Sequence, residues 1–244
     1  MDNEEANKIL DYIPYTAKTQ EEIDYFDFLW KSFCSNYDGE NYQFAFLSYH
    51  MLFMCAVYTL LAKMRLFDKN SFVKGMILCN DEDKKKIIES ESIFIFSLLN
   101  ERQTFQLFSL IGCSPEEIRE YKKLIDDRND IAHANGNIFF NSKEAISEKI
   151  NELTSCLEKL TICLEPLVLV KIKEFLISSI DSETREFEDD NEQFEQILVK
   201  ANYLSRRDIY GGVAKLDISS LNASPKFGEV KGLFDKLKER YSED

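Results

Sequence analysis

Residues 44–62 read FAFLSYHMLFMCAVYTLLA and carry no formal charge. A stretch of this length and character is close to the minimum for a membrane-spanning helix. Polar residues interrupt it, however, and its aromatic residues lie along the whole stretch rather than at its two ends. A helix that is apolar on all sides is typical of the middle of a helical bundle. We therefore expect a buried central helix over about residues 42–67, and no membrane span.

The rest of the chain favours an all-α fold around this helix. The 244 residues include only 8 Gly and 4 Pro, and long amphipathic runs separate these breakers. The pattern predicts helices over 4–12, 20–33, 71–78, 83–100, 104–111 and 141–180, the last kinked or interrupted at Pro166. The helix at 20–33 is predicted to turn Ile23, Phe26, Phe28, Leu29 and Trp30 toward the core.

Charge and glycine content change near residue 180. We expect residues 1–180 to form the helical bundle, and residues 181–244 to form an acidic helix and a C-terminal tail packed on it. The stretch 181–196 holds eight acidic residues against the single Arg185. It is interpreted as a solvated helix face or linker, with a regulatory segment that competes with an anionic substrate as the alternative. Residues 205–228 are predicted to be a loop or loosely packed tail, followed by a short helix at 232–241.

The overall composition limits the possible functions. A net charge of −14 argues against a broad basic surface for nucleic acid, although a small basic groove remains compatible with it. The six cysteines form no CxxC pair, and the chain has only two histidines, so neither a metal site nor a cofactor is expected. Free thiols and an acidic N-terminus, MDNEEANK, favour a cytoplasmic protein.

The clearest helix-start pattern in the sequence begins at residue 114. Ser114-Pro115-Glu116-Glu117 is a capping box with proline at the first helical position, and Asn135-Gly136 would end the helix near residue 134. One seam of this helix consists of Ile118, Tyr121, Ile125, Arg128 and Ala132. An unpaired guanidinium on a buried seam is costly. Arg128 is therefore expected to meet an anion, a water-filled cleft or a polar partner.

His133 is the second unusual residue of this helix. It follows Asn129 by four positions and so shares its face, whereas Arg128 lies about 140° away around the helix axis but has a long side chain. Imidazole moves protons near neutral pH, and guanidinium binds phosphate oxygens with a forked set of donors. The group suits a phosphodiester that is attacked by its own neighbouring hydroxyl, which is RNA chemistry.

The same residues resemble a known family. RNDIAH, residues 128–133, is similar to the Arg-Asn-x-x-x-His signature of HEPN domains, and the resemblance extends over about residues 25–180. It implies an all-α, HEPN-like helical bundle with extra helices at both ends. It also implies a metal-independent endoribonuclease that works as a homodimer in antiviral defence or in a stress or toxin response.

The resemblance implies roles for three residues. His133 would be the general acid and base, Arg128 would bind the scissile phosphate, and Asn129 would orient His133 or contact RNA. The products would be a 2′,3′-cyclic phosphate and a 5′-hydroxyl. Because cleavage needs both a proton acceptor and a proton donor, two copies of the motif are expected to meet across a two-fold axis.

One position departs from the family pattern. Toxins that are paired with a nucleotidyltransferase antitoxin carry a tyrosine two residues after the histidine, where this chain has Asn135. Control by modification of that tyrosine is therefore not expected, and a different regulatory protein partner fits better.

Alternative interpretations remain for each residue. His50 is either an ordinary core histidine or a residue that lines the same cleft, and Arg206 and Arg207 either contact RNA or form a plain surface patch. Arg128 could instead pair with a neighbouring carboxylate while His133 only finishes its helix. The chain would then be a non-catalytic HEPN-like module that binds a nucleotide or a partner protein.

Overall fold

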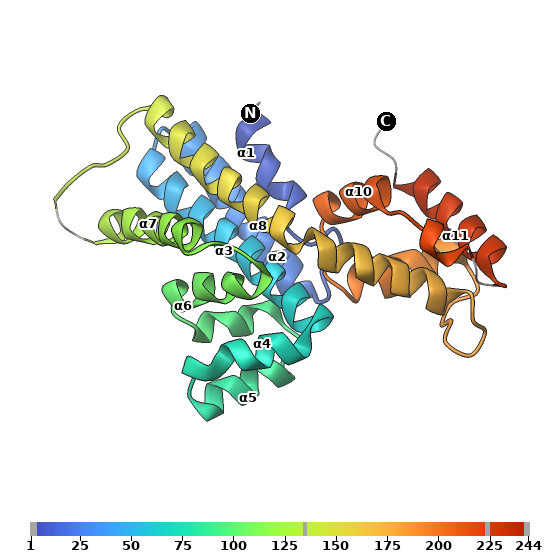
Figure 1. Cartoon of the computed structure of the whole chain (residues 1–244). Coiled ribbons are helices and arrows are strands. Elements are labelled where there is room, and N and C mark those ends of the chain that lie inside the picture. The colour runs from blue at the N-terminus through green and yellow to red at the C-terminus, as the bar shows by residue number, and fades with distance from the viewer. Residues whose placement is uncertain (1–3, 134–135, 223–224, 242–244) are drawn as a thin grey trace.

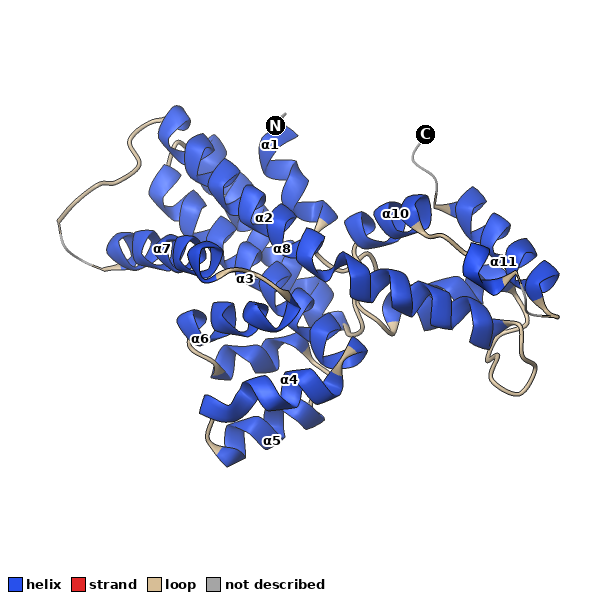
Figure 2. Cartoon of the chain, in the orientation of Figure 1, coloured by secondary structure: helices blue, strands red, loops and turns tan. Residues whose placement is uncertain are grey.

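Every regular element in the computed structural model is a helix within the residues that it describes, 4–133, 136–222 and 225–241 (Figures 1 and 2). The N-terminal segment consists of α1 (Glu4–Asn7) and the 3₁₀ turn η1 (Lys8–Asp11). An isolated β-bridge pairs Pro14 with Ser205. The predicted all-α class is confirmed.

The central helix is α3 (Tyr42–Phe67), with the bounds that the sequence predicts. It packs most extensively against α2 (Gln20–Asp38) and α8 (Lys143–Ser179). By length and composition alone α3 could cross a membrane, but 72% of its most apolar window is buried inside the protein. This burial is typical of the core helix of a soluble protein.

Helix α2 buries only part of the predicted stripe: Phe26 and Leu29 are confirmed as buried. Thr19 caps it by accepting a hydrogen bond from the backbone N–H of Glu22 at 3.2 Å. The prediction is wrong for Ile23 and Phe28, which are 42% and 62% exposed. The buried stripe has a charged member, which is why spacing of the apolar residues alone misplaced it. Its members are Glu22, Phe26, Leu29, Phe33 and Tyr37.

Short helices between residues 69 and 111 form a second layer beside α3 (Figure 1). The predicted continuous helix over 83–100 is wrong, because Ser90 and Ser92 both adopt extended backbone and separate two elements. The layer contains α4 (Lys69–Gly75), η2 (Met76–Leu78), α5 (Asp81–Glu89), η3 (Ile93–Leu98), α6 (Glu101–Gln106) and η4 (Leu107–Ile111).

Helix α8 joins the two ends of the molecule and continues through Pro166 without a break. It packs against α1 and α3, and also against the C-terminal helices, which lie beyond the bundle along its C-terminal half (Figure 1). Those helices are α9 (Asp190–Gln193), the π-helical η5 (Phe194–Lys200), α10 (Arg206–Lys215), η6 (Ser219–Leu221) and α11 (Phe227–Arg240).

The predicted loop over 205–228 is wrong for residues 206–215. Ser205 and Asp208 form a capping box that starts α10, although Gly211 and Gly212 resemble helix breakers in the sequence. Gly212 is instead where α10 approaches α8: a Cβ there would lie 2.5 Å from Cδ1 of Ile172.

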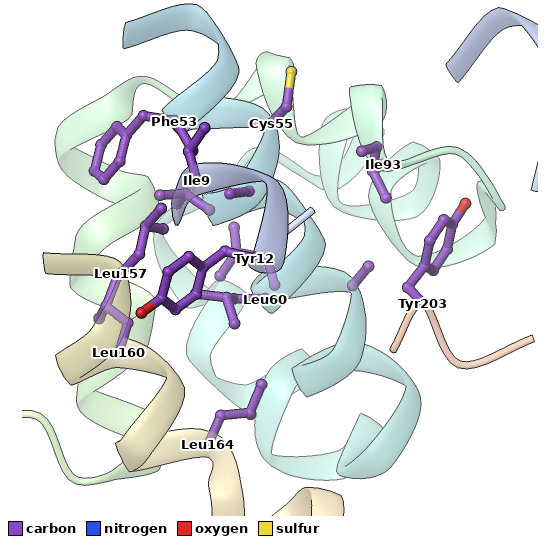
Figure 3. Packing of buried hydrophobic residues seen from close by; sticks show 14 of the residues in the cluster. Ile9, Tyr12, Phe53, Cys55, Leu60, Ile93, Leu157, Leu160, Leu164 and Tyr203 are labelled. Carbon is purple, nitrogen blue, oxygen red and sulfur yellow. The ribbon is translucent and has the colours of Figure 1, made fainter. Parts of the chain in front are cut away.

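Two buried polar contacts fix the C-terminal segment to the bundle. Lys63 of α3 forms a fully buried ion pair with Asp208 of α10. The Tyr203 hydroxyl donates to Oε1 of Glu22 at 2.9 Å and is 2.7 Å from the carbonyl oxygen of Glu91. Around these contacts the core is apolar, and residues from η1, α3 and α8 interleave within it (Figure 3).

Candidate functional site

The candidate site lies around the C-terminal end of α7 (Pro115–Ala132). The helix begins as predicted: the backbone N–H of Ser114 donates to Glu117 Oε2 at 2.7 Å, and the Glu117 N–H donates to Ser114 Oγ at 3.2 Å. Its buried face consists of Ile118, Tyr121, Leu124, Ile125 and Ile131. The predicted seam is therefore confirmed up to Ile125, whereas Ala132 is exposed.

The end of α7 differs from the prediction. The helix stops at Ala132, and His133 already has extended backbone with φ −92° and ψ 143°. Gly136 has the left-handed φ of 80°, but it lies four residues beyond the helix, and Asn135 is outside the described residues. His133 is therefore the C-cap of α7 rather than part of its last turn, and a shared face with Asn129 stays a prediction. The His133 side chain is exposed, and the backbone N–H of His133 donates to the Asn129 carbonyl at 3.2 Å.

Arg128 is paired with a carboxylate. Its guanidinium forms an ion pair with Glu101 at the start of α6, and the two side chains are 28% and 21% exposed. The neighbouring Asp127 is held elsewhere, because Lys149 of α8 donates to it at 2.9 Å. An ion pair therefore accounts for the half-buried arginine. The Arg128 side chain is still partly exposed, and a guanidinium has five N–H donors, more than this ion pair uses.

His50 lies on the other side of Glu101. Its Nε2 is 3.8 Å from Glu101 Oε2, which is too long for a hydrogen bond. The imidazole is fully buried, and neither ring nitrogen has a hydrogen-bond partner among the described residues. Burial lowers the pKa of His50, against the opposing effect of Glu101, so the ring is neutral at pH 7. Buried polar groups without partners cost roughly 1–3 kcal/mol each.

Glu101 remains ionised between these two partners. Burial acts to raise the pKa of its carboxyl group, but the net shift of the pKa is downward, and because His50 is neutral the paired Arg128 guanidinium is the charge that lowers it. Its Oε2 atom is buried and makes no hydrogen bond within the described part of the chain. Glu101 thus brings a hydrogen-bond acceptor, His50 a neutral imidazole and Arg128 a cation to the same place.

These three side chains line a pocket of about 760 Å³ between α2, α3, η3, α6 and α7. Its other walls are largely apolar and include Tyr25, Met54, Tyr58 and Phe94. The thiol of Cys55 also lines it, but burial raises the pKa of that thiol to about 12. Cys55 is therefore neutral and not a nucleophile at pH 7.

The structure brings some of the predicted residues together and leaves others apart. Arg128 and His50 share the pocket, while Asn129 and His133 follow at the adjoining end of α7 and are not among the lining residues. Arg206 and Arg207 lie at the start of α10. Arg206 Nε is 3.8 Å from Asp11 Oδ1, and Arg207 Nη2 is 3.7 Å from Glu158 Oε1. They do not line the pocket of Arg128.

Two candidate functional residues were not predicted from the sequence. Glu101 looks like an ordinary helix-start carboxylate, and its contact with Arg128 joins residues 27 positions apart. Gln43 is the second: its Nε2 donates to the Ile131 carbonyl at 3.4 Å, and its Oε1 accepts from the Phe139 N–H at 3.1 Å. Gln43 thus holds the end of α7 and the following segment against α3. No local pattern could reveal either contact.

Comparisons with known proteins do not assign the chain. No family model matches it, and neither the curated proteins nor the solved structures contain a match. Within the described ranges, no group of three or more His, Cys, Asp or Glu side chains is placed to hold a metal ion.

Proposed function

We propose that this chain is a HEPN-type endoribonuclease that cuts RNA without a metal ion and acts as a homodimer. The observation that carries the proposal is the position of Arg128 and His133. Arg128 lines an open pocket at the end of α7, and the exposed His133 is the residue directly after the end of that helix. A cation and a titratable base at one edge suit a phosphodiester.

The charges near this edge are compatible with a phosphate. Asp126 pairs with Arg102 and Asp127 pairs with Lys149, which offsets two carboxylates that would otherwise repel RNA. Arg128 shares its charge with Glu101, but a guanidinium has five N–H donors and can bind a carboxylate and a phosphate together.

The reaction follows from two copies of the motif. The RNA 2′-oxygen attacks the adjacent phosphorus while one His133 accepts its proton, and the bond from phosphorus to the 5′-oxygen breaks. The second copy's His133 donates a proton to that leaving oxygen. Arg128 stabilises the extra negative charge on the phosphoryl oxygens. The products are a 2′,3′-cyclic phosphate and a 5′-hydroxyl, and Asn129 would orient the histidine or contact RNA.

Variants at the two motif residues test this proposal. We expect His133→Ala and Arg128→Ala each to reduce the cleavage of tRNA or mRNA by about 10²–10⁴-fold. Arg119→Ala is the matched control, because Arg119 is an exposed arginine on the same helix that pairs with the exposed Glu116. Cleavage by the wild-type protein should persist in EDTA.

Mapping the cut ends and checking the fold complete the test. Circular dichroism should show the same helix content and melting temperature for His133→Ala as for wild type, because His133 is exposed beyond the helix end. If nuclease-free His133→Ala protein still cuts RNA at the wild-type rate, the proposal is wrong.

The setting of the activity is part of the same proposal. A cytoplasmic RNase that acts in antiviral defence or as a toxin would need a restraint, and a regulatory protein partner would supply it. Expression of wild type should stop cell growth, whereas His133→Ala should not. Equal growth arrest by both proteins would argue against RNA cleavage as the cause.

A non-catalytic nucleotide- or partner-binding module is the second candidate. The Arg128–Glu101 ion pair favours it, because Glu101 already neutralises the cation that a phosphate would need. Undetectable cleavage by wild type, together with binding of a nucleotide in the pocket, would favour this alternative.

A further inference from the structure

The pocket beside Arg128 contains more polar groups than the binding of a phosphate requires. His50 contributes two buried ring nitrogens and Glu101 contributes Oε2, and none of the three atoms has a hydrogen-bond partner among the described residues. All belong to side chains that line the same 760 Å³ pocket. Buried polar atoms that lack partners in a pocket are groups that a ligand can satisfy.

The hydrogen-bonding capacity of these groups limits the ligand. An ionised carboxylate only accepts hydrogen bonds, whereas a neutral imidazole donates one and accepts one. The ligand edge must therefore place donors opposite Glu101 and an acceptor opposite the imidazole N–H. Glu101 Oε2 and His50 Nε2 lie 3.8 Å apart, so that neighbouring atoms of one flat edge can meet both.

The walls of the pocket fit a flat heteroaromatic ring. Tyr25, Met54 and Phe94 line it, and the Tyr25 and Phe94 rings meet edge to face at 5.1 Å between centroids. Aromatic side chains stack on nucleobases whatever the base, and unpaired RNA bases are commonly read by hydrogen bonds along their Watson–Crick edge.

We propose that this pocket binds a guanine base, with Glu101 accepting from its N1–H and exocyclic amine and His50 donating to its O6. Guanine is the base whose Watson–Crick edge places two adjacent donors beside an acceptor. The inference rests on the proposed function in one respect: the guanine belongs to the RNA strand being cut, next to the phosphate that Arg128 holds. Glu101 and His50 are thus specificity-determining residues.

Binding of nucleoside monophosphates to the 244-residue chain tests the pocket independently of catalysis. Isothermal titration with GMP, AMP, CMP and UMP should show GMP bound roughly 10-fold or more tightly than the others. Glu101→Gln should remove that preference, because the amide offers only one acceptor atom. Glu116→Gln, the same change at an exposed carboxylate of α7, should keep it.

A second variant blocks the pocket without altering its polar groups. Ser97 is exposed and lines the pocket, so Ser97→Trp should abolish binding of all four nucleotides while leaving Glu101, His50 and Arg128 intact. Equal affinity for the four nucleotides, or a GMP preference that survives in either Glu101→Gln or Ser97→Trp, would overturn the inference.

Cleavage of oligoribonucleotides separates the inference from the proposed function. Strands of cytidine with a single guanosine should be cut next to the guanosine by wild type and at no preferred position by Glu101→Gln. Selective GMP binding without any cleavage would support the guanine pocket and overturn the nuclease. Cleavage with no preference for guanosine would overturn the pocket and leave the nuclease standing.

Discussion

At the residue scale, one carboxylate decides the chemistry around α7. Glu101 pairs with Arg128, lies 3.8 Å from His50 and leaves Oε2 free of hydrogen bonds within the described residues. The sequence indicates that Arg128 needs an anion, a water-filled cleft or a polar partner, and that His50 has two possible roles. It could not indicate that one side chain serves both, because Glu101 lies 27 positions from Arg128 and 51 positions from His50 and belongs to a separate short helix.

The buried neutral histidine predicts a pH dependence of stability. The folded-state pKa of His50 is lowered by burial, with Glu101, Arg128 and Asp127 as the charged groups around it. The unfolded chain therefore binds more protons below about pH 6.5, so the free energy of unfolding should fall with falling pH by up to about 1.4 kcal/mol per pH unit. Urea unfolding between pH 7 and 5.5 measures this slope.

Variants at the two histidines separate the contribution of His50 from that of the other groups. His50→Leu should give a flatter dependence than wild type, because an apolar side chain has no proton to bind. The exposed His133 is the chain's other histidine, and His133→Ala is the control for the removal of a histidine. A wild-type slope retained in His50→Leu would contradict the assignment.

At the element scale, periodicity predicted long helices well and short ones poorly. The bounds of α3 match because most of that helix is buried and charged residues are absent from most of it. The errors occur where a polar residue occupies a core position, as Glu22 does in α2, or where serines separate short helices. The α10 helix was missed because Gly211 and Gly212 suggested a loop, whereas Gly212 is needed for the close contact with α8.

The two adjacent glycines of α10 provide a matched test of this contact. Gly212→Leu should lower the free energy of unfolding by about 1–3 kcal/mol or more, because its Cβ would lie 2.5 Å from Ile172 Cδ1 and 3.6 Å from Val168 Cγ1. Gly211→Leu should be neutral or stabilise by up to about 1 kcal/mol, because no described atom other than its chain neighbours and its own helix backbone lies within 4 Å of that Cβ, and leucine favours helices. Denaturant unfolding of both variants measures the difference, and equal effects would show that α10 does not pack on α8 as described.

At the scale of the whole molecule, the proposed reaction requires a second copy, and one surface suits it. Phe44, Leu47 and Met51 follow helical spacing on α3 and form what we term the α3 stripe. Phe44 and Met51 are 62% and 44% exposed, and both Leu47 and Met51 line the pocket that contains Arg128. A two-fold contact through the α3 stripe would bring two pockets, and two α7 ends, close to one axis.

Charge on this stripe should therefore impair association and cleavage together. Phe44→Glu and Met51→Glu should each raise the dimer dissociation constant by roughly 30-fold or more, because buried interface anchors typically contribute 2 kcal/mol or more. Val170→Glu is the control, since Val170 is 54% exposed on α8 and does not line the pocket. Analytical ultracentrifugation measures the association, and added salt should strengthen it because each copy carries a charge of −14.

Cleavage by the stripe variants should recover at high protein concentration, whereas cleavage by His133→Ala should not. If wild type cuts RNA at full rate while it sediments as a monomer, the paired-motif mechanism fails.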